Sequence, residues 1–154
     1  MGTIGDVADV SRIFANTNTA AAGGAVAALI LTQIMSGKAD LTMVLNGALA
    51  GLVSITAEPL MPSLGLATII GAIGGIIIVF SVPLLDRLKI DDVVGAISVH
   101  GIAGIWGTLA VVLSNSDASF GTQLLGTVSI CLFTFIVSYI CLLYTSDAAD
   151  ELRS

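Results

Sequence analysis

Five apolar segments, each long enough to cross a lipid bilayer, make up most of this 154-residue chain. They cover residues 13–35, 41–57, 64–85, 93–113 and 120–140. A transmembrane helix needs about 20 mostly apolar residues, whereas the helices of soluble domains alternate apolar and polar faces. Because the loops between the segments are short, consecutive segments must run antiparallel. The sequence therefore predicts an all-α, polytopic membrane bundle of about five transmembrane helices.

The composition excludes a soluble globular domain. Hydrophobic residues make up 56% of the chain and charged residues only 10%, while soluble domains contain about a quarter charged residues. We expect this protein to lie in a lipid bilayer and not to bind nucleic acid. Small residues four positions apart predict that three helices pack closely, because such spacing lets helix backbones touch in lipid. These residues are Ala20, Gly24 and Ala28 in the first segment, Gly47 and Gly51 in the second, and Gly71 and Gly75 in the third.

The basic residues indicate how the helices are oriented. Lys38 lies in the first loop, and Arg87 and Lys89 lie in the third, whereas the second and fourth loops contain no Lys or Arg. Basic loops are retained on the cytoplasmic side of a membrane. The N-terminal end of the chain is then expected outside and the C-terminal end in the cytoplasm, with Arg12 as a mild counterexample.

Several polar residues near the segments have structural interpretations. Residues 16–19, with the sequence NTNT, are expected to cap the first helix or to bond with neighbouring helices. Asp91 and Asp92 precede the fourth helix and are expected to cap it. A carboxylate at this position accepts hydrogen bonds from the free N–H groups of the first turn. We expect an interhelical hydrogen bond from Asn46 and core packing for Trp106.

His100 is the only histidine, and it lies near the middle of the fourth apolar segment. An ionisable residue at that depth usually faces a bundle interior or a water-filled path. Small residues at helical spacing, Ala96, Ala103, Gly104 and Gly107, leave room beside the imidazole for another helix or a narrow lumen. His100 is therefore a candidate transport residue. The alternative is that its imidazole only bonds to a neighbouring helix.

The run KIDDVVGAISVHGIAGIWGTLAV resembles the tenth transmembrane helix of the ammonium transporter (Amt/MEP/Rh) family, in its Amt branch. ANTNTAAAGG resembles the start of the seventh helix of that family, NGALAGLVSITA the eighth and IIGAIGGIIIVFSV the ninth. The resemblance implies that the chain is a C-terminal fragment that supplies helices seven to eleven of an eleven-helix fold, which has two inverted halves. It also implies a homotrimer in the plasma membrane, or in the inner membrane of a Gram-negative bacterium.

The resemblance implies transport of ammonium or ammonia through a channel-like path, without enzymatic chemistry, cofactor or metal. His100 matches the second histidine of the family's pore-lining pair, and Ala96 and Ile97 are pore-adjacent by position. The first histidine belongs to a helix that this sequence lacks, so we expect the chain alone to be inactive. Contact with a cytoplasmic PII-type regulator is a further implication for the parent protein.

Two alternatives to a transporter remain open. An ammonium sensor can be built on the same membrane scaffold. A membrane haem or metal protein would use His100 as a ligand, although such a site needs further donors.

The C-terminal residues differ from the rest of the chain. From Cys141 the sequence reads CLLYTSDAADE, which matches the translation of a transposon-end sequencing adapter. The alternative is a natural acidic cytoplasmic tail. We expect residues 1–140 to be a partial ammonium transporter membrane domain and residues 141–154 to be a translated adapter.

Overall fold

The computed structural model describes the backbone of residues 3–151 and the side chains of residues 3–145. These residues form helices joined by short loops, with no strand among them, which confirms the all-α prediction. In chain order, the helices are α1 (Ile4–Ser36), α2 (Leu41–Ile55), α3 (Leu64–Arg87), the π-helix η1 (Ile97–Ile102), α4 (Ala103–Ala110), the short 3-10 helix η2 (Val111–Leu113) and α5 (Phe120–Glu151). The chain divides after Ala118 into one unit containing α1 to η2 and a second unit containing α5.

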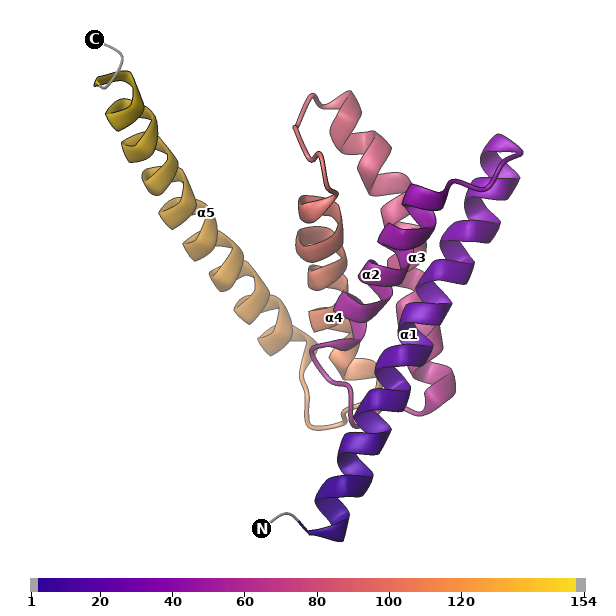
Figure 1. Ribbon diagram of the computed structural model, residues 1–154. Helices are drawn as coiled ribbons and strands as arrows, with labels where there is room; N and C mark the ends of the chain where they lie inside the picture. Colours follow the sequence, from indigo (N-terminus) through magenta and orange to yellow (C-terminus); the bar gives the residue numbers. More distant parts are fainter. Residues whose placement is uncertain (1–2, 152–154) are drawn as a thin grey trace. The chain divides into compact units, whose positions relative to one another are not determined.

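In the first unit, successive long segments alternate in direction, as the short loops predict (Figure 1). Helices α1, α2 and α3 pack together, and the η1–α4 segment packs on α2 and α3. Within the described residues, three helices are long and apolar enough to span a membrane by length and composition: α1, α3 and the Phe120–Thr145 part of α5. The other two predicted spans are shorter apolar helices, Leu41–Ile55 and Ile97–Leu113. At 1.5 Å per residue, the 15 residues of α2 rise about 22 Å, less than the hydrocarbon core of about 30 Å.

Helix α1 begins at Ile4, nine residues before the predicted start of the first span. Thr3 and Asp6 form a capping box, in which the Asp6 N–H donates to the Thr3 hydroxyl oxygen and the Thr3 N–H donates to the Asp6 carboxylate. Because this cap satisfies the free N–H groups of the first turn, the helix begins before the acidic residues and extends through them. Residues 16–19 consequently lie inside α1, so the prediction that they cap it is wrong.

The predicted close packing of small residues is confirmed. Added Cβ atoms at Gly71 and Gly75 of α3 would lie under 3.0 Å from the backbone of Ala20 and Gly24 in α1. Gly47 and Gly51 of α2 are equally close to α1. The three helix backbones therefore touch where the sequence places glycine, as expected for association in lipid.

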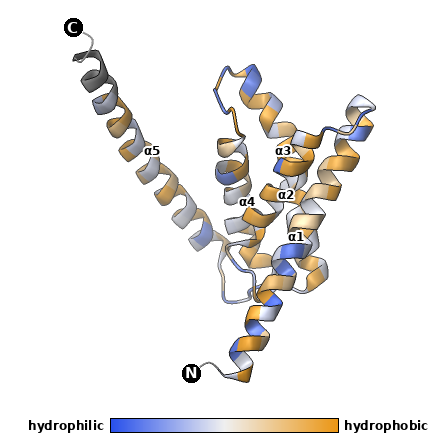
Figure 2. Cartoon of the chain, viewed as in Figure 1, coloured by the Kyte–Doolittle hydropathy of each residue, from blue (hydrophilic) through white to orange (hydrophobic). Residues whose placement is uncertain are grey.

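Hydrophobic residues predominate along the helices, and hydrophilic residues lie in the loops and along the N-terminal half of α1 (Figure 2). In the first unit, Ile30, Ile69 and Phe80 are more than half exposed. In the second unit, helix α5 exposes apolar residues such as Phe133 and Ile136. Exposed apolar surface of this extent fits a lipid environment and would be a liability in water.

Candidate functional site

The side chain of His100 lies on the exposed face of η1, a single π-helical stretch between Ile97 and Ile102. Ser98 and Val99 are buried on the opposite side, where Val99 packs with Ala50 of α2 and Ile78 of α3. The imidazole is therefore presented by a helix whose other face is fixed in the first unit. Single π-helical turns occur frequently at functional sites.

The two predicted pore-adjacent residues lie close to His100 in the chain and are also exposed. Ala96 is one helical turn before it, and Ile97 is 44% exposed. The predicted stripe of small residues beside the imidazole is only partly present. Ala103 and Gly107 are buried, and a Cβ on Gly107 would lie 2.6 Å from the carbonyl oxygen of Ser54. These two residues pack α4 against its neighbours, because the π turn rotates them away from the side of His100.

Asp92 fixes the start of the helix that carries His100. Its carboxylate accepts hydrogen bonds from the N–H groups of Ile97, at 2.9 Å, and Ser98, at 3.1 Å. The predicted capping role is thus confirmed for Asp92. Gly95 has a φ of 70°, in the left-handed region that favours glycine, and it turns the backbone into this cap. As a result η1 begins at Ile97, four residues after the predicted start of the span.

The hydrogen bonds to Asp92 also determine its ionisation. Partial burial by itself would raise the pKa of the carboxyl group, but the N–H donors of Ile97 and Ser98 outweigh this effect. The pKa of Asp92 is therefore held below its ordinary value. The carboxylate stays charged at the positive end of the helix that presents His100.

Trp106 packs against a buried cluster that includes Ala20, Ile55 and Ile70, so the predicted core role is confirmed. The sequence did not predict its hydrogen bond, in which the indole N–H donates to the Ile70 carbonyl oxygen at 3.0 Å. This bond ties α4 to α3 two turns beyond His100.

Asn16 is fully buried and joins α1 to the loop between α2 and α3. Its amide nitrogen donates to the carbonyl oxygens of Pro59, at 2.9 Å, and Pro62, at 2.8 Å. The bonds of Asn16 therefore go to a loop, and not to a neighbouring helix as expected for residues 16–19. Asn46 lies against Gly95, since a Cβ on that glycine would be 3.3 Å from the Asn46 amide nitrogen.

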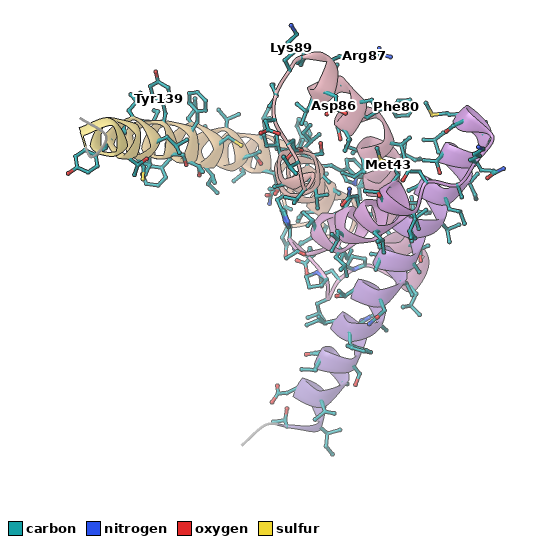
Figure 3. The ribbon with its side chains drawn as sticks, turned by 45° about the horizontal axis from the view of Figure 1, so that its top comes forward. Met43, Phe80, Asp86, Arg87, Lys89 and Tyr139 are labelled. Carbon is teal, nitrogen blue, oxygen red and sulfur yellow. The ribbon has the colours of Figure 1, made fainter. Side chains whose placement is uncertain are left out.

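The basic side chains lie where the loop pattern predicts. Figure 3 shows Arg87 and Lys89 projecting away from the helices at the end of α3. The loop between α1 and α2, which contains Lys38, lies at the same end of the first unit (Figure 1). The basic residues of the first and third loops therefore lie together at one end of the first unit.

Within the described residues, no three His, Cys, Asp or Glu side chains come together in a way that could hold a metal ion. Cys131 and Cys141 are free and exposed on α5. His100 therefore has no metal-ligand partners in this part of the protein, and the exposed imidazole is the feature that requires a function.

The sequence from residue 2 to 154 matches the model of the Ammonium Transporter Family. The chain belongs to the ammonium transporter family. Among its relatives, the ammonium transporter Amt2 of Archaeoglobus fulgidus is 46% identical over 112 residues, which are 73% of this chain and 24% of Amt2. The chain spans between 24% and 35% of the length of the curated relatives that it matches.

Solved structures of an Amt protein and of Mep2 have a similar fold. A structure titled "Sensor Amt Protein" has a TM-score of 0.78 and 33% identity, covering 87% of this chain and 37% of that one. The structure of Candida albicans Mep2 has a TM-score of 0.77 and 28% identity, covering 86% of this chain and 33% of Mep2. The fold described above is therefore part of the ammonium transporter fold.

Proposed function

We propose that this chain supplies helices seven to eleven of a membrane transporter for ammonium or ammonia, and that His100 lines the conduction path. The observation that carries the proposal is the exposed imidazole on η1, in a family member whose remaining helices lie outside this chain. An ionisable group on a membrane helix is costly unless it meets protein or water. A path lined by further helices would provide both.

His100 would act by accepting or relaying a proton next to the moving substrate. A second imidazole, contributed by a helix outside this chain, would share a hydrogen bond with it. Burial disfavours a second positive charge, so the pair would be neutral or carry one shared proton. Ala96 and Ile97 would form the wall beside it. No bond of the substrate is broken except to a proton, so the function is transport and not enzymatic catalysis.

The test is ammonium uptake by the full-length protein in cells that lack other ammonium uptake. Replacing His100 by Ala should abolish most uptake, while Leu113→Ala, an exposed change at the far end of the same helix segment, should leave uptake near the wild-type level. The 154-residue chain alone should not restore growth on limiting ammonium. Growth with the chain alone, or full uptake by the His100→Ala protein, would contradict the proposal.

An ammonium sensor is the second candidate, favoured by the match to the structure titled "Sensor Amt Protein". Both candidates use the same membrane scaffold. A sensor would bind ammonium without sustaining uptake, and it would carry a signalling domain. The uptake measurement therefore separates the two, since binding without growth favours the sensor.

We also propose an orientation in the plasma membrane, or in the inner membrane of a Gram-negative bacterium. The end that carries Lys38, Arg87 and Lys89 would face the cytoplasm, with the N-terminal end of the chain outside and the C-terminal end inside. In a protein without native cysteines, Cys at position 38 should resist a membrane-impermeant maleimide in intact cells, and Cys at position 116 should react. The reverse pattern would invert the orientation.

The full-length parent would be a homotrimer with a cytoplasmic PII-type regulator as a partner. A mass measurement in detergent would test the trimer, and co-purification with the regulator in low and high ammonium would test the partner.

Residues 141–154 would be a translated adapter. This proposal rests on the eleven-residue identity alone, since the family match and α5 both continue past Cys141. Sequencing the genomic locus across codon 141 tests it directly.

A further inference from the structure

The loop that leads from α3 into η1 is closed by hydrogen bonds to a single residue, Asp92 (Figure 1). The Gly95 N–H donates to the Asp92 carbonyl oxygen at 2.9 Å, which makes a tight turn. The Asp92 carboxylate then accepts from the N–H groups of Ile97, at 2.9 Å, and Ser98, at 3.1 Å. One residue therefore holds both the turn and the first N–H groups of the helix that carries His100.

The reach of these bonds sets the place where the helix begins. A capping side chain ordinarily accepts from the second or third residue after it, whereas the Asp92 carboxylate accepts from residues 5 and 6 positions later. The N–H group of Val99 already bonds to the Gly95 carbonyl oxygen, at 2.7 Å. Three successive N–H groups are thus assigned to fixed acceptors, and His100 is the next residue in the chain.

The surroundings of the turn prevent a simple adjustment. Gly95 has a φ of 70°, and a Cβ on it would lie 3.3 Å from the amide nitrogen of Asn46 in α2. Ser98 is fully buried, so water cannot replace the carboxylate as the acceptor of its N–H group. Without the Asp92 carboxylate this donor would be buried and unpaired. The first turn of η1 would then have to rearrange to satisfy it.

Such a rearrangement changes the direction in which His100 points. One residue of a helix corresponds to a rotation of about 100°, so a shift of one residue in the hydrogen-bond register of η1 would turn the imidazole by that angle. A π-helical stretch is a local departure from the α-helical register, and its ends have to be fixed by other contacts. The bonds to Asp92 fix one end.

We propose that Asp92 positions His100 in the conduction path by fixing the hydrogen-bond register of η1. Its role in transport rests on the proposed function, whereas its effect on the direction of the imidazole rests on the bonds to Ile97 and Ser98. Asp92 itself would not touch the substrate. A misplacement of about 1 Å can cost a hundredfold in rate, so a residue of this kind can control transport from a distance.

The imidazole provides a readout that does not depend on transport. His100 is the only histidine, so the 154-residue chain, purified in detergent without a histidine tag, gives one set of imidazole NMR signals. At about pH 9 the ring is neutral in every variant, and differences in charge do not contribute. Asp92→Ala should shift these signals or split them into two sets. Spectra taken well below the unfolding temperature exclude a general loss of stability as the cause.

Two further variants make the comparison specific. Asp92→Asn should keep the wild-type signals, since asparagine also caps helices. Asp91→Ala removes the neighbouring, exposed carboxylate, while the hydrogen bonds to the start of η1 come from Asp92. Its imidazole signals should match those of the wild type. Gly95→Ala disturbs the same turn without touching the carboxylate, and it should shift the signals as Asp92→Ala does.

Uptake by the full-length protein tests the consequence for transport. Asp92→Ala should lower the maximal rate of ammonium uptake about tenfold or more and leave the apparent KM within about twofold, because the relay is misplaced while substrate entry is not. Asp92→Asn should restore most of the rate, and Asp91→Ala should leave it unchanged.

The outcomes separate this inference from the proposed function. Wild-type imidazole signals in Asp92→Ala overturn the positioning role, whatever the uptake assay gives. Equal losses of uptake in Asp92→Asn and Asp92→Ala also overturn it, since the charge and not the cap would then be required. If His100→Ala takes up ammonium at the full rate, the proposed function fails, while the NMR comparison still decides whether Asp92 directs the imidazole. If Asp92→Ala does not fold, Gly95→Ala decides the same question.

Discussion

The indole nitrogen of Trp106 lies 3.0 Å from the backbone carbonyl oxygen of Ile70, which joins α4 to α3 inside an otherwise apolar contact. Trp106→Phe keeps an aromatic ring at this position and removes the donor. We expect a loss of about 1 kcal/mol in the free energy of unfolding, the usual net value of one hydrogen bond. Chemical unfolding in detergent measures it. Trp106→Ala, which also removes the packing of the ring, should cost more; equal costs would mean that the hydrogen bond contributes everything.

Gly75 and Gly65 lie in the same helix but in opposite surroundings. A Cβ on Gly75 would lie under 3.0 Å from the backbone of Gly24, whereas a Cβ on Gly65 meets nothing within 4 Å. Gly75→Ala should therefore force α1 and α3 apart and lower stability by about 2 kcal/mol, within the range for overpacking. Gly65→Ala should be neutral or slightly stabilising, because alanine favours helix. Thermal unfolding of the two variants compares them, and similar shifts would contradict the close packing of α1 on α3.

Asn16 and Asn18 differ in the bonds that their side chains make. Asn16→Ala removes the donor to the partly buried Pro59 carbonyl and the buried Pro62 carbonyl, so we expect a loss of about 2 kcal/mol. Asn18 is exposed and donates only to the Phe14 carbonyl of its own helix. Asn18→Ala should change stability by less than about 0.5 kcal/mol. Limited proteolysis of the loop after α2 should also accelerate only in the Asn16 variant.

The pKa of Asp92 is lowered in the folded protein, so its charged form stabilises the fold. This contribution is fully present above the unfolded pKa of about 3.9 and is lost as the pH falls through the lower folded value. Asp92→Ala should cost about 1 kcal/mol at neutral pH, as expected for a lost helix cap. The difference from wild type should shrink in acid below about pH 4.

Asp92→Asn is the matched control, because asparagine caps helices about as well as aspartate and does not titrate. This variant should keep most of the stability at neutral pH and should lack the acid-dependent loss. Unfolding measured from neutral pH to about pH 3 gives both curves. If the difference in the free energy of unfolding between wild type and Asp92→Asn did not vary with pH, the Asp92 carboxylate would not be a titrating cap.

The sequence predicted the features that depend on periodicity and size. Five helical regions follow from long apolar segments, and the contact of α1 with α2 and α3 follows from the spacing of Ala20, Gly24, Gly47 and Gly71. Asp92 was predictable as a cap because a carboxylate preceded an apolar run. These features are local, or they depend on one residue type at one spacing.

Other features depend on contacts that a linear pattern does not contain. The Asn16 bonds to Pro59 and Pro62 join residues more than 40 positions apart. The early start of α1 does not follow from the apolar segment at 13–35, although Thr3 and Asp6 have the capping-box spacing. The π-helical stretch has no marker in the sequence, so Ala103 was expected beside His100 and is buried instead.

The π-helical stretch has a further consequence for how this helix tolerates change. One extra residue in a turn advances the helix by about 100°, so the residues before and after η1 follow different phases. The packing of Gly107 and Ala110 is therefore set independently of the direction in which His100 points. Deleting a single residue within 97–102 would restore a regular helix and turn the imidazole by that angle, while leaving the buried contacts of α4 intact.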